Sequence, residues 1–181
     1  MIFANADCFT MSLSFKSATN LLSATVKYEP KMHIVLHQPE IPPNTGAVGR
    51  TCVALGAKLW LVRPLGFQMD EKALRRAGLD YWQYLEWEIA NTWNELLQQF
   101  EQDQRFFFFS RFGNTEYTDI QFFNGDCLVF GSETAGLPRS ITEANPEKLV
   151  RIPTEPNVRS LNLASSVAVA GFEASRQLKL N

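Results

Sequence analysis

From residue 32 onward, short and nearly continuous apolar runs alternate with stretches in which apolar residues recur at helical spacing. The apolar runs predict buried strands at 33–36, 58–62, 105–109, 127–130 and 149–152, and a weaker pattern predicts one at 84–89. The helical spacing predicts helices at 44–55, 70–77, 92–100 and 161–178. Strands that are apolar throughout and alternate with helices are typical of a mostly parallel sheet covered on both faces. The predicted fold class is therefore α/β.

Turn and capping residues suggest where the first predicted helix begins and ends. Pro42 and Pro43 are expected to stop any regular element, after which Asn44 and Thr45 can cap the helix. Gly56 is expected to end it in the left-handed conformation that glycine adopts most easily.

The first 31 residues differ from the rest and are set apart from the predicted domain, residues 32–181. They are rich in Ser, Thr, Asn and Ala, and show no clear periodicity. Three interpretations stay open: an extension upstream of a start at Met32, a targeting peptide, or an N-terminal arm. A secretory signal is disfavoured because no apolar stretch follows a basic segment. A transit peptide is usually rich in arginine, and no arginine precedes Arg50.

Composition narrows the class of protein further. The 181 residues contain no apolar window of the roughly 18 residues that a membrane helix needs. Cys8, Cys52 and Cys127 stand far apart, which argues against a disulfide framework and favours a reduced, cytoplasmic compartment. His33 and His37 would share one face of a strand, but two ligands are too few for a metal site, and we expect no metal.

Three polar clusters follow predicted strands, at the edge of an α/β sheet where ligands usually bind. They are residues 44–50 (NTGAVGR), residues 131–138 (GSETAGLP) and residues 151–163 (RIPTEPNVRSLNL). The first would open a helix whose backbone N–H groups favour an anion, with Arg50 near its mouth. In the alternative interpretation, Asn44 is only a helix cap and Arg50 only a solvated side chain.

The second and third clusters also have two interpretations each. Glu133 lies between glycines, where it either serves a ligand site or caps the next helix. In the third cluster Ser160 can be a helix cap. That role leaves Arg159 and Asn162 unexplained.

Taken together, the clusters match N-x-G-x-x-x-R, G-x-E-x-x-G-L, and I-P followed by S-L-N-L. In this order they closely resemble the three motifs of the SPOUT RNA methyltransferases, the class with a C-terminal trefoil knot. The resemblance covers residues 32 to about 180. Two longer blocks, residues 39–46 (PEIPPNTG) and 74–81 (LRRAGLDY), resemble the branch of this family that methylates the wobble nucleotide of tRNA.

The resemblance implies a fold, a cofactor and a partner. The fold would be a SPOUT α/β domain with a deep C-terminal knot. S-adenosylmethionine would be held there by loops that contain Phe109, Gly131, Ile152 and Ser160, with Leu161 alongside. The enzyme would be a homodimer with composite active sites. Its substrate would be the ribose 2′-hydroxyl of cytidine or uridine 34 in leucine tRNAs.

The resemblance also implies catalytic roles. Arg50 is the family's essential arginine by position, and because arginine is a poor base it would bind an RNA phosphate and stabilise developing negative charge. Asn44, Glu133 and Asn162 would fix the loops and hold Arg50 in place. Ser160 or the phosphate would share in removing the proton. Transfer of a methyl group to a hydroxyl needs no metal.

Basic side chains are the expected RNA contacts. Arg50, Arg159 and a cluster on the helix 70–77, formed by Lys72, Arg75 and Arg76, are the main candidates. Arg111 and Arg139 are further ones. Because the formal net charge is −2, RNA binding must rest on such local patches.

Other functions remain open at this level. The chain could methylate another RNA, or it could be a silent RNA-binding factor that keeps the knot. A nicotinamide-binding domain is disfavoured because the G-x-G-x-x-G fingerprint is missing. The last predicted helix carries many small and apolar residues, which suits either a core position or contact with a second subunit.

Overall fold

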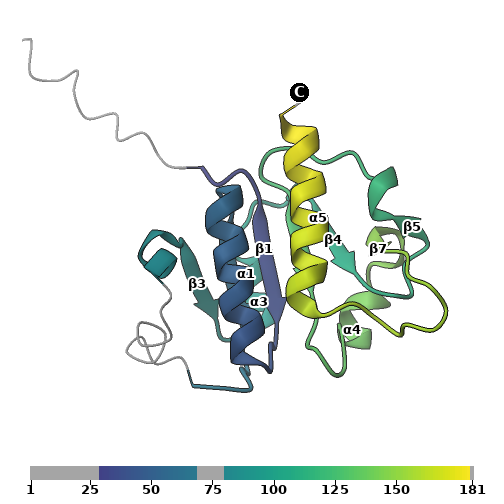
Figure 1. The fold of residues 1–181 in the computed structure, drawn as a ribbon, viewed down its shortest axis with the longest axis horizontal. Helices are drawn as coiled ribbons and strands as arrows, with labels where there is room; N and C mark the ends of the chain where they lie inside the picture. The colour runs from purple at the N-terminus through teal and green to yellow at the C-terminus, as the bar shows by residue number, and fades with distance from the viewer. Residues whose placement is uncertain (1–28, 69–79, 180–181) are drawn as a thin grey trace, which may run out of the picture.

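A computed structural model describes residues 29–68 and 80–179, which form one seven-stranded sheet (Figure 1). The strands are β1 (His33–His37), β2 (Lys58–Val62), β3 (Trp87–Ala90), β4 (Phe106–Phe109), β5 (Thr115–Glu116), β6 (Cys127–Phe130) and β7 (Leu149–Arg151). Their order is β3-β2-β1-β6-β4-β7-β5, and every neighbouring pair is parallel. The predicted α/β class with a parallel sheet is therefore confirmed.

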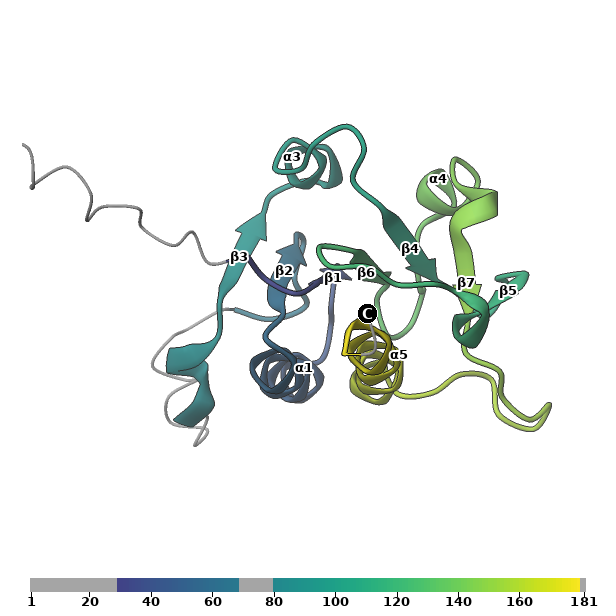
Figure 2. The same cartoon turned by 90° about the horizontal axis from the view of Figure 1, so that it is seen from above.

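Helices cover both faces of this sheet (Figure 2). They are α1 (Pro42–Leu55), α3 (Trp93–Leu97), α4 (Arg139–Thr142) and α5 (Leu163–Leu178), with short 3-10 turns η1 (Asp80–Tyr84), η2 (Tyr117–Asp119) and η3 (Pro146–Lys148). Helices α1 and α5 lie side by side on one face, whereas α3 and α4 lie on the other (Figure 2). The trefoil knot that the resemblance implies stays a prediction.

The core has two layers because side chains alternate across each strand. Ile34, Leu36 and Leu59 point to the layer under α1 and α5, while Val35 and Trp60 point to the layer under α3 and α4. This two-sided burial explains why the strands are nearly continuous apolar runs. Helices α1 and α5 approach so closely that a Cβ on Gly171 would lie 2.6 Å from Cδ1 of Leu55.

The start of α1 differs from the prediction. Pro42 and Pro43 do not stop a regular element but form the first positions of the helix, where their missing N–H groups cost nothing. Ile41 is the N-cap residue, so Asn44 lies inside the helix and is not its cap. The predicted end is confirmed, since Gly56 has the left-handed angle φ 67°.

Other boundaries shift by a few residues. The weak strand begins only at Trp87, because Tyr84 closes η1. Helix α3 is shorter than expected, with the Thr92 side chain capping it by accepting from the Glu95 N–H. Helix α5 begins at Leu163 with Asn162 as its cap, so Ser160 is not the cap of that helix.

Some predictions fall outside the described residues. These are the helix 70–77 with its basic cluster and the segment 1–28. In the part of the chain that the structure describes, no helix is both long and apolar enough to cross a membrane.

Candidate active site

The loop that follows β6 is folded into a tight turn at the carboxyl edge of the sheet. Ser132 and Gly136 exchange two backbone hydrogen bonds of 3.2 and 2.9 Å, and Gly136 has φ 71°. A Cβ on Gly131 would overlap the backbone of Gly136 and Leu137. Both glycines of the second motif are therefore required by the turn. The turn fixes where Glu133 points.

The carboxylate of Glu133 binds the segment that leads into α1. It accepts hydrogen bonds from the backbone N–H groups of Glu40 (2.8 Å) and Ile41 (3.3 Å), and from Nδ2 of Asn44 (2.9 Å). A second contact joins the same two loops, since Oγ1 of Thr134 donates to Oε1 of Glu40 at 2.7 Å. The alternative in which Glu133 caps the next helix is therefore wrong.

Asn162 joins this pair to the start of α5. Its side-chain oxygen accepts from the backbone N–H groups of Ala164 (2.9 Å) and Ser165 (3.3 Å). Its Nδ2 donates to Oδ1 of Asn44 at 2.9 Å. Glu133, Asn44 and Asn162 thus form one chain of hydrogen bonds in which each amide has a single consistent orientation. The structure brings one residue from each sequence motif together.

Arg50 lies on the exposed surface of α1, apart from this chain. Its guanidinium stacks over the Tyr81 ring at 4.7 Å, and the Tyr81 hydroxyl donates to the carbonyl of Gly46 at 2.6 Å. Among the described residues, none of the three side chains of the hydrogen-bonded chain makes a hydrogen bond to Arg50. The expectation that they hold Arg50 in place stays a prediction. Tyr81 orients it, and the only sequence signal for that residue was the 74–81 block.

Three residues of the third motif occupy the loop before α5. Arg159, Ser160 and Leu161 are all exposed, and Leu161 keeps 37% of its surface open. Within the described residues, no side-chain hydrogen bond joins Ser160 to Glu133 or Asn44. A role for Ser160 stays a prediction.

The expected cofactor residues lie in a row along the carboxyl edge. Strands β6, β4 and β7 are neighbours in that order, and Gly131, Phe109 and Ile152 stand at their ends. The Phe109 ring stacks on Phe130 at 4.5 Å with planes 14° apart. Phe109 therefore closes the core beneath the loops.

The other polar and reactive groups that the sequence singled out are structural. His33 lies between Phe100 and Trp60, and its Nδ1 accepts from the Trp60 indole N–H at 3.1 Å. Burial, reinforced by the charge of Lys58, lowers the His33 pKa to about 4. Cys52 and Cys127 are buried, as predicted, and burial raises the pKa of both thiols. Among the described residues there is no cluster of three metal-ligating side chains.

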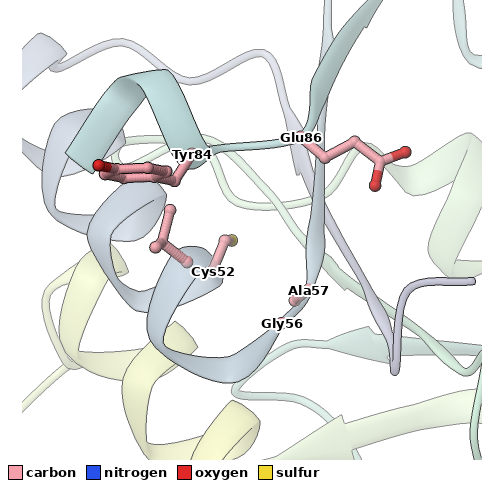
Figure 3. Close-up of a pocket in the computed structure, with 6 residues that line it drawn as sticks. Cys52, Gly56, Ala57, Tyr84 and Glu86 are labelled. Atoms are coloured by element: carbon pink, nitrogen blue, oxygen red, sulfur yellow. The ribbon is translucent and has the colours of Figure 1, made fainter. Parts of the chain in front are cut away.

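A cavity of about 300 Å³ lies at the opposite, amino edge of the sheet (Figure 3). It is lined by Cys52, Val53, Gly56, Ala57, Tyr84 and Glu86. None of the motif residues contributes to it. The candidate active site is therefore the carboxyl edge.

Comparison with known proteins shows the family of this chain. Residues 31–172 match the SpoU rRNA Methylase family. The chain is 47% identical over 147 residues to a tRNA (cytidine(34)-2′-O)-methyltransferase of Burkholderia ambifaria, covering 80% of this chain and 94% of that protein.

Solved structures show the same fold. One that concerns the 2-OH methylation of C/U34 on tRNA has a TM-score of 0.78 and 44% identity, covering 84% of this chain and 99% of that one. An AdoMet-bound rRNA methyltransferase from Sinorhizobium meliloti has a TM-score of 0.71 and 27% identity, covering 83% of this chain and 57% of that one. With the three motifs joined at one edge of the sheet, the chain belongs to the SpoU methylase family.

Proposed function

We propose that this chain transfers the methyl group of S-adenosylmethionine to the ribose 2′-hydroxyl of the wobble nucleotide, cytidine or uridine 34, in leucine tRNAs. The observation that carries the proposal is the hydrogen-bonded chain Glu133–Asn44–Asn162, which unites the three family motifs at one site. Its support is the likeness to relatives that are named for this reaction.

The loops at the carboxyl edge suit S-adenosylmethionine. The tight Gly131–Gly136 turn leaves no space for a side chain at its start, so it offers backbone donors and acceptors to a ligand. Phe109, Gly131, Ile152, Ser160 and Leu161 would hold the cofactor, with the half-buried Ile152 and the partly exposed Leu161 supplying apolar contact. When bound, the cofactor supplies a methyl group on a positively charged sulfur.

Side chains of this chain would position the RNA and stabilise the negative charge that develops on the ribose oxygen. Arg50, held over Tyr81, would bind a phosphate of the RNA next to the reacting ribose. It would also stabilise the 2′-oxygen as that oxygen loses its proton. The phosphate would take up the proton, either directly or through the Ser160 hydroxyl, which would accept the proton and pass its own proton on. Arg159 and the basic residues Lys72, Arg75 and Arg76 would make further phosphate contacts.

The site is proposed to be completed by a second copy of the chain. Helix α5 exposes apolar side chains on its outer face, with Phe172 55% and Val169 37% open. A homodimer that covers this face would bury these side chains, and each active site would then be shared between the two copies. The proposed tRNA substrate implies a cytoplasmic location.

The test is methyl transfer from labelled S-adenosylmethionine to tRNA from a strain without its own wobble methylase, followed by nuclease mapping. We expect label at the 2′-oxygen of nucleotide 34. Arg50→Ala should lower the rate by roughly 100-fold or more, as for other groups that stabilise a developing oxyanion. Lys148→Ala, at an exposed position of η3 on the amino edge, is the matched control.

Each contrary outcome has a definite meaning. Label at another nucleotide moves the activity to a different RNA site. Cofactor binding without any label on tRNA moves the activity to another RNA, whereas a failure to bind the cofactor makes the chain a silent RNA-binding factor. A rate for Arg50→Ala within a few-fold of the wild type removes the arginine from the mechanism.

A further inference from the structure

An exposed aromatic side chain stands directly beside the candidate site. Phe112 is 71% exposed, and it lies three residues beyond Phe109 in the loop that follows β4. A phenyl ring left this open to water is unfavourable for a folded chain on its own.

The loop that carries Phe112 is firmly held. The Phe112 N–H donates to Oγ of Ser110 at 3.3 Å, and the Gly113 N–H donates to the carbonyl of Ser110 at 3.0 Å. A Cβ on Gly113 would lie 2.6 Å from the carbonyl carbon of Val150, so the loop rests on the backbone of β7. The ring is thus presented from a fixed turn beside the loop of Ile152.

Arg111 stacks on this ring, with its guanidinium carbon 4.4 Å from the ring centre. The same edge of the sheet also exposes Arg63, Arg159 and Arg139, the first residue of α4. Within the described residues, none of these arginines is in an ion pair. An open ring among unpaired cations matches the requirements of a single-stranded nucleic acid, whose bases stack on aromatic rings while its phosphates bind arginine.

A second pair of the same kind occurs at the opposite end of β4, and it differs in one respect. Arg105 stacks over Phe123 at 4.7 Å, and Phe123 is 46% exposed. Arg105, however, is paired with the buried Asp126 at 3.4 Å, and it donates to the carbonyl of Gln121 at 2.8 Å. The charge of Arg105 is therefore neutralised by Asp126, and its guanidinium has a structural role. Arg111, in contrast, remains available to a partner.

We propose that Phe112 is a stacking platform for an unpaired nucleobase of the RNA substrate, and that Arg111 binds the phosphate next to that base. The proposal rests on the proposed function, since it takes the substrate to be a tRNA anticodon loop. It makes the β4 loop a positioning element, which holds the strand while the 2′-hydroxyl is aligned. Phe112 itself touches no reacting atom.

The experiment compares the full-length wild type with Phe112→Ala, Phe112→Tyr and Phe123→Ala. The probe is a fluorescent anticodon stem-loop RNA with cytidine at position 34, and its Kd is measured by anisotropy beside kcat and KM for methyl transfer. Loss of one stacked base should weaken binding by about 5- to 150-fold for Phe112→Ala. The loss should appear in KM, while cofactor affinity, melting temperature and oligomeric state stay unchanged. Phe112→Tyr should restore binding, and Phe123→Ala should bind as the wild type does.

Arg111→Gln gives a second readout. Removing one phosphate contact should reduce the slope of log Kd against log salt by about 0.7. The proposal is overturned if Phe112→Ala binds RNA as tightly as the wild type does. It is also overturned if Phe123→Ala loses as much RNA affinity as Phe112→Ala, or if Phe112→Ala dissociates a dimer. A wild type that binds the RNA without methylating it defeats the proposed function instead, and the comparison of Kd values still decides the role of Phe112.

Discussion

Asn162 donates a hydrogen bond from Nδ2 to Oδ1 of Asn44 at 2.9 Å, although 118 positions separate the two residues. Oδ1 of Asn162 accepts hydrogen bonds from backbone N–H groups at the start of α5. Asn44 therefore has to turn its NH₂ group toward Glu133. The bond ties the first and last helices of the described fold to the same loop.

Asn44→Asp should disrupt this chain without changing the size of the side chain. The new carboxylate would face Glu133 across the 2.9 Å contact that Asn44 now makes, and like charges at this distance repel. We expect a loss of about 1–3 kcal/mol in the free energy of unfolding, measured by urea titration at pH 8. The loss should shrink at pH 5.5, as one carboxyl of the pair takes up a proton. An equal loss at both pH values would show that repulsion is not the cause.

The two glycines of the second motif should respond differently to substitution. Gly136→Ala should lower the free energy of unfolding by about 1–2 kcal/mol, because the left-handed angle φ 71° is unfavourable for alanine. The new Cβ would meet no atom within 4 Å. Gly131→Ala should cost about 3 kcal/mol or more, because its Cβ would overlap the facing backbone.

The control for this pair is Gly125→Ala, at an open position with φ 88° on the amino edge. It should destabilise the chain as Gly136→Ala does but leave cofactor binding intact. Equal losses for Gly131→Ala and Gly136→Ala in denaturant titrations would contradict the assignment of the tight turn.

Phe172→Glu should dissociate the proposed homodimer. The substitution puts a charge in the middle of the exposed apolar face of α5, where a partner helix would have to bury it. Sedimentation velocity should show monomers, and methyl transfer should fall with the loss of composite sites. Leu97→Glu, a partly exposed position on α3 across the sheet, should remain dimeric. A wild type that sediments as an active monomer would rule out the shared site.

His33 should make the fold sensitive to mild acid. Its imidazole takes up a proton near pH 6.5 in an unfolded chain but only at a pKa of about 4 in the folded one. Between these values the unfolded state binds more protons, so stability is complete above about pH 6.5 and is lost as the pH falls toward 4. The loss amounts to at most about 3 kcal/mol.

His33→Asn tests this dependence, because an amide oxygen can still accept from the Trp60 indole. The variant should lose less stability between pH 6.5 and 4 in parallel denaturant titrations. Part of the slope should persist, since burial also lowers the pKa of His37. Glu173 contributes at lower pH: its hydrogen bond from Arg176 lowers its pKa to about 2, and that stability is lost below about pH 4.5. If the free energy of unfolding of His33→Asn depends on pH as that of the wild type does, groups other than His33 cause the acid response.

The strands of the sheet could be predicted from the sequence because burial on both faces leaves a continuous apolar run. Residues 127–130 are buried throughout and form β6 with the predicted bounds. The two-residue strand β5 has no such pattern, since it is defined by its pairing with β7. A strand this short leaves no periodic signal.

The sequence by itself determined the α/β class, the glycine that ends α1 and the identity of the residues that gather at the site. Only the tertiary structure decided what those residues do. Asn44 could have been a cap for its own helix, but its partners come from loops 89 and 118 positions away. A local pattern reports which hydrogen bonds a side chain can make with its sequence neighbours. The order of the strands decides which distant loops share an edge, and that order brings Glu133, Asn44 and Asn162 together.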